Sequence, residues 1–455
     1  MKKYQTVCFL LSFLCLPIFT TAADPQRPNI VLMMMDNLGW GELGVYGGGE
    51  LRGAATPRLD KLASEGLQLL NFNVESICSS SRSALLTGRH AVRSGTWNPR
   101  GNGNGLERDE ITIAELLSKA DYMTGLFGKW HLGKTPGYLP TDQGFDYWYG
   151  TTESTRSVAY PTQLQYDDTE SSPQMILRAY KDKTPKPVKA YGMDERRSMD
   201  SELVQEAINF MQQNVRAKKS FFAELSFTQP HYPTLPHKDF AGKTGNGNFA
   251  DVLAEIDYRA GQVLDAIKKL GIEENTIIIW TSDNGPEWRY PYHGSAGVWR
   301  GNYYTALEGS LRVPFLIRWP NKIKPGGTSN EIVHLVDLLP TLAKVADQPM
   351  PDDRPIDGVD QLDFFLSKQS HSNREGFPIF GRHDKLYAYK WRNWKIHYTK
   401  VDDVRSSLEP LQLKLIYNLL TDPKEEYEMG PDGYWVLPIV QKKVNAFNRT
   451  LENNQ

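Results

Sequence analysis

Cys78 is the residue of this sequence whose type and setting point most directly to chemistry. The chain contains three cysteines, and the other two, Cys8 and Cys15, lie in a short apolar N-terminal stretch that has the form of a cleavable leader. Without them Cys78 has no partner for an intramolecular disulfide, so it is either a small buried hydrophobic residue or a chemical group. It opens the run CSSSR, which ends at Arg82 and stands at the expected start of a helix. These polar neighbours favour a chemical role.

Two Asp-Asn pairs supply a second set of candidate residues. Asp36-Asn37 and Asp283-Asn284 each follow an apolar run of the length of a buried strand. A single such pair is best explained as the start of a turn. Two pairs at equivalent strand ends instead favour a site for a hard cation, because carboxylate and amide oxygens suit Ca²⁺ before Mg²⁺.

Three further residues could supply a positive charge or transfer a proton. Lys129 and His131 are two residues apart, so in an extended segment their side chains leave from the same face. His231 lies in a loop between Pro230 and Pro233, which restrict its backbone. Each histidine taken alone is more simply explained as a packing or surface residue, so residue type alone assigns no catalyst here.

The elements that must position these side chains follow from alternating apolar runs and helical patterns. Thr56 with Pro57 is typical of a helix start, and Thr112 with Glu115 predicts a capping box. Strands are expected at 29–35, 124–127, 221–227 and 276–281. This alternation predicts an α/β fold with a large, mostly parallel sheet covered by helices on both faces. In such sheets ligands bind outside the carboxyl ends of the strands, where both Asp-Asn pairs stand.

Length and composition predict the domain organisation. The 455 residues exceed what one ordinary core holds, so we expect a large domain and a smaller appended one. The expected division is a signal peptide over 1–23, a catalytic domain over 24–357 and a C-terminal α+β subdomain over 358–455. The stretch 151–197 is polar and lacks clear periodicity, and we interpret it as a substrate-facing insertion.

Charge and hydropathy argue against two classes of partner. With 52 basic and 54 acidic residues, the formal net charge of −2 gives no indication of nucleic-acid binding. No apolar run reaches the length of a membrane span. Export without disulfides favours a bacterial periplasmic or extracellular enzyme that is stabilised by its core.

Several short segments give the chain a specific resemblance to a known family. They are GWGELG at 39–44, TPRLD at 56–60, CSSSR at 78–82 with LTGR at 86–89, GKWHLG at 128–133 and SDNG at 282–285. Each is weak alone, but in this order and spacing the chain resembles the sulfatases, the formylglycine-dependent branch of the alkaline-phosphatase-like hydrolases. The resemblance covers nearly the whole chain after the leader.

The resemblance implies that a formylglycine-generating maturation enzyme oxidises Cys78 to formylglycine (3-oxoalanine). The hydrated aldehyde carries two hydroxyls on one carbon, of which one attacks sulfur and the other expels sulfate. A divalent cation, Ca²⁺ with Mg²⁺ as the alternative, would polarise the sulfate. The implied ligands are Asp36, Asn37, Asp283, Asn284 and the group at position 78. Arg82 would orient the nucleophile.

The same resemblance assigns roles to the remaining candidates. Lys129 and His231 would contact the sulfate and the bridging oxygen, with His231 as the proton donor to the leaving group. His131 would act as the base in the elimination step. Ser154 falls where the family often places a serine that contacts the sulfate, and a plain surface serine is an equally good explanation of it.

Three positions depart from the family pattern. Ser80 stands where the modification motif usually has proline or alanine. This difference affects which maturation enzyme recognises the motif around Cys78. Asn37 replaces the second aspartate of the first metal pair, so we expect metal binding to be weaker or differently tuned. Tyr303 falls where the family has a second sulfate-binding lysine, and it can donate a hydrogen bond but carries no charge. His293 or Arg300 is the alternative at this substrate-binding position.

The leading hypothesis is an exported, calcium-dependent sulfatase that hydrolyses a sulfate ester on a carbohydrate. One alternative is a phosphomonoesterase or phosphodiesterase of the same superfamily, although such enzymes commonly have serine or threonine as the nucleophile and often two metals. The other alternative is a homologue that binds sulfated glycans without turning them over. The three departures from the family pattern favour this alternative.

Overall fold

The fold is built on one large sheet, as the alternation of apolar runs predicts. A computed structural model describes residues 27–97, 105–167, 169, 173–403 and 407–452, so the predicted signal peptide lies outside the described residues. Among these residues the sheet has eleven strands, in the order β12-β2-β11-β8-β1-β7-β3-β4-β5-β6 with β13 beside β2. They are β1 (Asn29–Asp36), β2 (Leu67–Asn73), β3 (Met123–Lys129), β4 (Tyr147–Thr151), β5 (Met175–Tyr180), β6 (Lys186–Ala190), β7 (Phe221–Pro230), β8 (Thr276–Ser282), β11 (Arg312–Arg318), β12 (Gly327–Ser329) and β13 (Val333–His334).

The centre of the sheet is parallel. Strand β1 pairs in parallel with β7 and β8, and β3 pairs in parallel with β7 and β4. Antiparallel pairs occur where β11 joins β8 and β2, and where β5 and β6 extend the opposite edge. The predicted class of fold, an α/β protein with a mostly parallel sheet, is therefore confirmed.

The apolar run of β1 is continuous because both of its faces are buried. Ile30, Leu32 and Met34 pack into the core on one face of the sheet, while Val31 and Met33 pack into the core on the other. Each of these side chains is fully buried. A strand with alternating polarity would leave one face in water, so this pattern requires helices on both sides.

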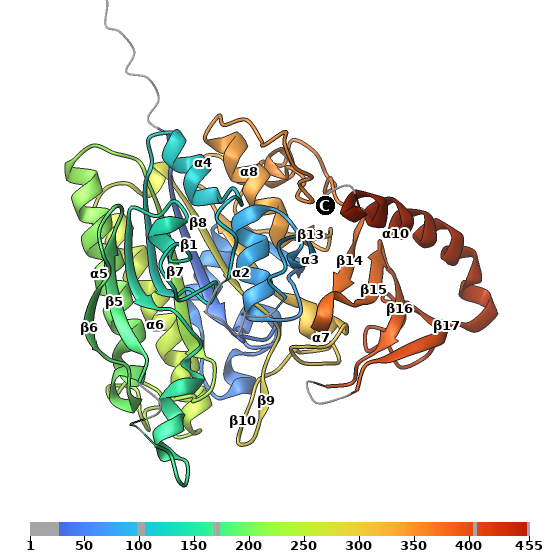
Figure 1. Ribbon diagram of the computed structural model, residues 1–455, viewed down its shortest axis with the longest axis horizontal. Helices are drawn as coiled ribbons and strands as arrows, with labels where there is room; N and C mark the ends of the chain where they lie inside the picture. Colours follow the sequence, from blue (N-terminus) through green and yellow to red (C-terminus); the bar gives the residue numbers. More distant parts are fainter. Residues whose placement is uncertain (1–26, 98–104, 168, 170–172, 404–406, 453–455) are drawn as a thin grey trace, which may run out of the picture.

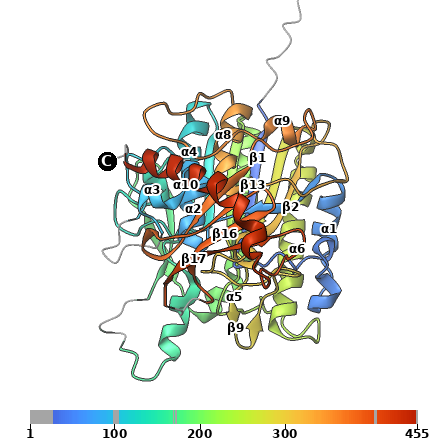
Figure 2. The ribbon, with the colours of Figure 1, turned by 90° about the vertical axis from the view of Figure 1, so that its right-hand side faces the viewer.

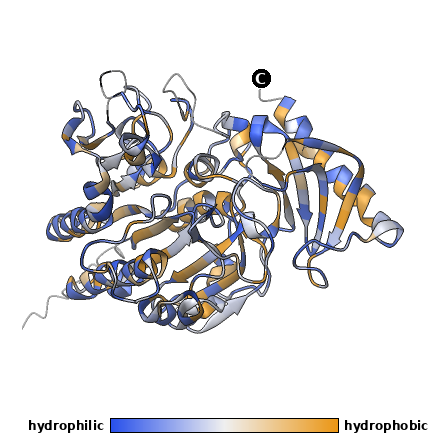
Figure 3. Ribbon diagram, turned by 90° about the horizontal axis from the view of Figure 1, so that it is seen from below, coloured by the Kyte–Doolittle hydropathy of each residue, from blue (hydrophilic) through white to orange (hydrophobic). Residues whose placement is uncertain are grey.

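Helices cover the two faces as separate layers (Figure 1). One face carries α2 (Cys78–Thr87), α4 (Ile113–Lys119), α8 (Leu338–Val345) and α9 (Leu362–Phe365). The other carries α1 (Pro57–Ser64), α5 (Met193–Arg216) and α6 (Asn248–Lys269). Two short helices, α3 (Ala91–Ser94) and α7 (Glu308–Leu311), lie in connecting segments. Figure 3 shows apolar strands inside and polar residues on the outer helices.

The predicted helix starts differ in how they are capped. Thr112 accepts a hydrogen bond from the backbone of Glu115, whose carboxylate accepts one from the backbone of Thr112, so the capping box is confirmed. Thr56 precedes α1 as expected but makes no capping bond. Its hydroxyl instead accepts from Gly44 N and donates to Asp60, because the chain from η1 (Gly44–Tyr46) packs against this end of the helix.

The stretch 151–197 has more regular structure than its lack of periodicity indicates. It contributes strands β5 and β6 to the sheet edge and the first turn of α5, in addition to a 3₁₀ helix, η4 (Thr155–Thr162). Strand β5 pairs with β4, and β6 pairs with β5, so these strands are stabilised by pairing rather than by burial of both faces. Their sequences therefore carry little apolar alternation, which explains why the pattern missed them.

The C-terminal part forms a second, antiparallel sheet. Its strands run in the order β14 (Gly376–Phe380), β15 (Leu386–Trp391), β16 (Trp394–Lys400) and β17 (Glu409–Asn418). The last helix, α10 (Leu437–Glu452), lies across this sheet (Figure 2) and buries Val440 and Val444 against it. The predicted boundary at 357/358 stays a prediction, since α9 still packs on the large core while the small sheet begins at Gly376.

A buried group of charges fixes the small sheet to the large one. Lys390 and Lys395 both donate to the carboxylate of Glu308, and Lys395 also donates to Glu425. All four side chains are fully buried. Because Glu308 begins α7, these contacts tie this short helix to the small sheet.

Candidate active site

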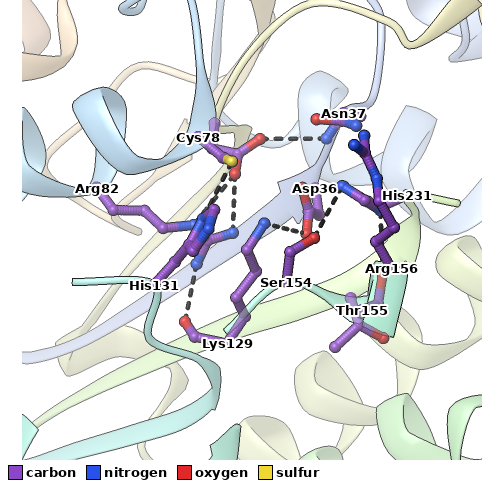
Figure 4. Close-up of polar contacts among 12 residues, drawn as sticks. Asp36, Asn37, Cys78, Arg82, Lys129, His131, Ser154, Thr155, Arg156 and His231 are labelled. Carbon is purple, nitrogen blue, oxygen red and sulfur yellow. Dashed lines mark hydrogen bonds and ion pairs between the residues drawn. The ribbon is translucent and has the colours of Figure 1, made fainter. Parts of the chain in front are cut away.

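The strand order places the predicted residues next to one another. Strands β8, β1, β7 and β3 are consecutive neighbours in the sheet, and their carboxyl ends lie at the same edge. Asp283 follows β8, Asp36 ends β1, His231 follows β7 and Lys129 ends β3. Residues from four distant segments therefore meet at one edge, as Figure 4 shows for most of them.

The proposed metal ligands lie in one buried cluster. Asn37 N donates to Asp283 Oδ1 at 3.1 Å, and Asn284 Nδ2 donates to Asn37 Oδ1 at 2.7 Å. Among the described residues, Asp36 Oδ1 and Asn284 Oδ1 are buried without a hydrogen-bond partner. Buried oxygens without partners are costly, and oxygen donors of this kind suit a hard divalent cation. The residues present thus fit the cation that the sequence predicts, with the amide of Asn37 engaged in the cluster.

The two carboxylates of this cluster differ in pKa. Burial would raise the pKa of Asp36, but the charges of Lys129, His231 and Arg82 hold it well below its usual range. Burial and the charge of Asp36 raise the pKa of Asp283 to about 6. A divalent cation between the two would stabilise both negative charges.

Cys78 is the first residue of α2, a helix in which every side chain is buried. Its Sγ lies 3.1 Å from His131 Nδ1. Burial raises the pKa of the Cys78 thiol, and the nearby charge of Lys129 only partly opposes this. The thiol is therefore protonated near neutral pH and lacks the thiolate that a cysteine nucleophile needs. Two residues on, Ser80 Oγ donates to the carbonyl of Trp97 at 3.0 Å, so this departure is accommodated in the fold.

Arg82 lies one turn further along α2 and links two of the strand ends. Its Nη2 donates to Asp283 Oδ2 at 2.8 Å, and its Nη1 donates to the carbonyl of Lys129 at 2.9 Å. Lys129 Nζ in turn donates to Asp36 Oδ2 at 2.8 Å. These charge-assisted bonds hold both cations beside Cys78 with little freedom to move.

His131 reaches the site by a route that the sequence did not predict. The expectation of an extended segment from Lys129 to His131 is wrong, because His131 has a left-handed backbone with φ of 64°. Its backbone N–H donates to the carbonyl of Thr152, which turns the chain and brings the imidazole to Cys78. Burial and the charges of Lys129 and Arg82 hold the pKa of His131 well below its usual range, so the ring is neutral and can accept a proton.

His231 is clamped by the two residues that open η4. Its Nδ1 lies 2.7 Å from the carbonyl of Tyr232 and 3.0 Å from Thr155 Oγ1. Because a carbonyl only accepts, we assign the proton of the neutral ring to Nδ1. Nε2 then accepts from Ser154 Oγ at 3.1 Å and faces the site. Ser154 thus lies at the site, where its hydroxyl contacts His231.

Tyr303 lies beside a carboxylate and an arginine that the sequence did not single out. Tyr303 Oη lies 3.4 Å from Glu287 Oε1 and 3.4 Å from Arg156 Nη2. The other oxygen of Glu287 accepts from Asn37 Nδ2 at 3.2 Å, so the amide at position 37 has an anionic partner outside the metal cluster. Glu287 lies in a loop and Arg156 in the 3₁₀ helix η4, both without periodicity in the sequence, and only their spatial proximity reveals them.

The two alternatives to Tyr303 are placed elsewhere. His293 is exposed on the hairpin formed by β9 (Trp288–Arg289) and β10 (Tyr292–His293), where its ring stacks on Trp288. Arg300 donates from Nη2 to the carbonyl of Glu425, toward the C-terminal sheet. The structure therefore brings Arg156, rather than either of these, next to Tyr303.

A second cluster of titrating side chains lies at the junction with the C-terminal sheet. Glu75, His90 and His334 are buried with ligand atoms within 4.8 Å of one another. His90 Nδ1 lies 2.7 Å from Glu75 Oε1, and Val336 N donates to His334 Nδ1. The ring of His334 packs on Phe377 of β14. These contacts are those of a hydrogen-bonded junction between the two sheets.

The chain matches two protein-family models. The model of the sulfatase family matches residues 28–348, and the model named "N-sulphoglucosamine sulphohydrolase, C-terminal" matches residues 302–428. The first covers the large sheet and all the site residues above.

Relatives with assigned activities cover nearly the whole chain. Human arylsulfatase A is 34% identical over 447 residues, covering 91% of this chain and 86% of its own. The N-acetylgalactosamine-6-sulfatase of Canis lupus familiaris is 31% identical over 460 residues, covering 92% and 85%.

Solved structures of sulfatases are also similar to this chain over most of its length. The crystal structure of the PsFucS1 sulfatase from Pseudoalteromonas sp. superposes with a TM-score of 0.89 at 32% identity, covering 94% of this chain and 91% of that one. The crystal structure of Ps i-CgsB in complex with a neocarrahexaose has a TM-score of 0.77 at 25% identity, covering 94% of each chain.

Proposed function

Because this chain belongs to the sulfatase family and is a sulfuric ester hydrolase, we propose that it removes a sulfate group from a sulfated carbohydrate. The proposal includes a formylglycine made from Cys78 and a divalent cation, Ca²⁺ before Mg²⁺, held by the two Asp-Asn pairs. The observation that carries it is the buried cluster around Cys78, in which Lys129, Arg82 and His131 converge on a residue that is not itself a reactive thiolate.

The formylglycine and the cation would supply the central chemistry. Hydrated formylglycine offers one hydroxyl to attack sulfur and a second through which sulfate is expelled. The cation, when bound, polarises the sulfate and lowers the pKa of the attacking hydroxyl. Water and the ester are thereby converted to an alcohol and hydrogen sulfate.

The residues of the chain bind the sulfate and move protons. Lys129 and Arg82 place positive charge beside position 78 and offset the charge of the sulfate. His131 Nδ1 lies 3.1 Å from Cys78 Sγ, and this proximity supports its proposed role of taking a proton from the group at position 78.

His231 is the proposed proton donor to the leaving alcohol. Burial lowers its pKa, while the charges of Asp36 and Glu287 oppose this effect. A bound sulfate adds negative charge next to Nε2 and raises this lowered pKa. Protonation at Nε2 then supplies the proton, and Ser154 and Thr155 hold the ring in place.

Carbohydrate as the substrate class is supported by the relatives. N-acetylgalactosamine-6-sulfatase is named for a sugar substrate, and Ps i-CgsB was crystallised with a neocarrahexaose. Among the described residues, no helix has the length and apolar character needed to cross a membrane. Export to the periplasm or the medium is proposed from the N-terminal leader alone.

Mass spectrometry of the Cys78 peptide, together with assays of sulfate and phosphate release, tests the proposal. Protein from the natural host is expected to carry an aldehyde at position 78 and to release sulfate from an aryl sulfate. A wholly unmodified thiol in an active preparation would contradict the formylglycine. Faster release of phosphate than of sulfate would favour the phosphoesterase alternative, and tight binding of sulfated sugars without turnover would favour a glycan-binding homologue.

A further inference from the structure

Arg156 lies at the edge of the site and has no role in the reaction described above. We propose that it binds a second oxyanion of the substrate, a sulfate or a carboxylate carried by the alcohol part of the molecule. This inference rests on the proposed function and extends it, because it restricts the substrate to carbohydrates with two negative charges close together.

The contacts of Arg156 hold its guanidinium while leaving it accessible. Its Nη2 lies 3.4 Å from Tyr303 Oη and 3.7 Å from Glu287 Oε1. The side chain is 44% exposed, whereas that of Glu287 is 10% exposed. Among the described residues, both of these contacts use Nη2, so Nε and Nη1 present their N–H groups to a ligand.

Glu287 is bound more firmly from its other side. Its Oε2 accepts from Asn37 Nδ2 and from the backbone N–H of Tyr232, both at 3.2 Å. The ion pair with Arg156 is longer than the 2.8 Å pair between Lys129 and Asp36. Glu287 therefore positions the guanidinium, and a shorter, bidentate bond to an incoming oxyanion remains available to Arg156.

The position of Arg156 relative to His231 indicates which part of the substrate it meets. Arg156 directly follows Ser154 and Thr155, which bond the two ring nitrogens of His231. Figure 4 shows His231 and Arg156 on one side of Asp36, and Arg82 with His131 on the other. Since His231 is the proposed donor to the leaving alcohol, Arg156 lies on the side of that alcohol rather than on the side of the nucleophile.

An oxyanion is a better partner here than a sugar hydroxyl. A guanidinium forms parallel bonds to sulfate or carboxylate oxygens, and charge-assisted bonds are about twice as strong as neutral ones. The uncharged Tyr303 beside it accepts from Arg156 and donates its one proton to Glu287, so it holds the arginine without adding a competing cation. Arg156 thus forms a place for an anionic group next to the sulfate that is removed.

The test compares matched sugars that differ only in the second oxyanion. The probes are a monosulfated hexose, the same hexose with a second sulfate, and the corresponding sulfated hexuronic acid, with 4-nitrophenyl sulfate as the reference for the shared reaction. The enzyme prepared with its formylglycine and cation is expected to prefer at least one dianionic probe over the monosulfated hexose in kcat/KM. Preference for the disulfated probe or for the uronic acid identifies the oxyanion as sulfate or carboxylate.

Variants at position 156 are expected to remove this preference. Arg156→Gln should lower the ratio of kcat/KM for the preferred dianionic probe to kcat/KM for the monosulfated hexose by about ten- to hundredfold. The effect should come chiefly through KM, because one charge-assisted contact is lost. Arg156→Lys keeps the charge without the planar fork and should recover part of the ratio. Arg178→Gln is the matched control, since Arg178 is also a partly exposed arginine paired with a glutamate, Glu206, at the sheet edge.

Binding provides a readout independent of turnover. In the Cys78→Ala background, calorimetry with the intact probes should show the same loss of preference when Arg156→Gln is added. Equal losses on mono- and dianionic probes would overturn the inference, because Arg156 would then bind the scissile sulfate. A wild-type enzyme that prefers neither dianionic probe over the monosulfated hexose would overturn it as well.

Failure of the proposed function would look different. A chain that carries formylglycine and cation but releases no sulfate from 4-nitrophenyl sulfate or any sugar would contradict the hydrolase itself. Normal sulfate release with an unchanged ratio in Arg156→Gln would overturn only the role of Arg156.

Discussion

Lys129 Nζ donates to Asp36 Oδ2 at 2.8 Å, and both side chains are completely buried. The lysine therefore neutralises a carboxylate that would otherwise be too costly to bury in its ionised form. The same pair places one positive charge at the proposed sulfate position and keeps one proposed metal ligand ionised, so it would link the stability of the site to its chemistry.

Breaking this pair should destabilise the protein measurably. In metal-free buffer, Lys129→Met is expected to lower the free energy of unfolding by about 3–5 kcal/mol, because it leaves the Asp36 charge unpaired. The double variant Lys129→Met/Asp36→Asn should recover part of this loss, since no buried charge remains. Urea denaturation measures both, and purely additive losses would show that the two residues do not interact.

Cys78→Ala should abolish sulfate release while the fold stays intact. The side chain of alanine offers no group that can be converted to an aldehyde, so no nucleophile forms at position 78. Sulfate release and circular dichroism are the measurements, with Ser83→Ala in the same helix as the control. Cys78→Ser should turn over at most once, because serine has a single hydroxyl. Activity equal to wild type in Cys78→Ala would exclude this residue as the source of the nucleophile.

Chelation followed by readdition of a single ion should identify the metal. Removal of divalent cations is expected to stop sulfate release and to lower the midpoint of thermal unfolding, because Asp36 Oδ1 and Asn284 Oδ1 lose their partner. Ca²⁺ should restore more of both than Mg²⁺, which demands a stricter octahedral geometry. Asn284→Ala should raise the Ca²⁺ concentration needed for half recovery about tenfold or more. Insensitivity of both readouts to chelation would argue against this cation site.

Glu224 should make the stability of the protein depend on pH. This residue lies in β7 with Oε2 buried and, among the described residues, without a partner. Burial raises its pKa from the ordinary value of 4.5 to about 7, although the charge of Arg82 and a hydrogen bond from Ser226 oppose this. Between these two values the unfolded chain releases the proton first, so the folded state loses stability as pH rises.

Glu224→Gln removes this titration and tests the sign. The difference in unfolding free energy between Glu224→Gln and wild type should grow by at most about 3 kcal/mol in favour of the variant as pH rises from about 4.5 to about 7. Above that range the difference should stay constant. Urea denaturation at several pH values measures it, and a difference that shrinks with rising pH would contradict the raised pKa.

The candidate site was largely predictable because its residues occupy strand ends. Asp36 and Asp283 end buried apolar runs, and in a parallel sheet the carboxyl ends of neighbouring strands share one edge. The strand order confirmed this expectation by placing β8 beside β1. Cys78 was recognisable because it lacked a disulfide partner and had polar neighbours, and the structure places its sulfur against His131.

Other features could not be read from local pattern. Strands β5 and β6 are edge strands that pair through their backbones, so their side chains carry no apolar signal. His131 was expected in an extended segment, but its left-handed backbone depends on a hydrogen bond to Thr152 across the neighbouring strand.

The sequence by itself therefore determined the fold class, the candidate nucleophile and the candidate oxygen ligands, because these depend on residue type and on period along the chain. Only the tertiary structure decided that Arg156 and Glu287 meet at Tyr303, and that Ser154 and Thr155 hold His231. The physical reason is that the contacts of Ser154, Thr155 and Arg156 join segments more than seventy residues apart, whose conformations are set by packing and charge pairing rather than by local periodicity.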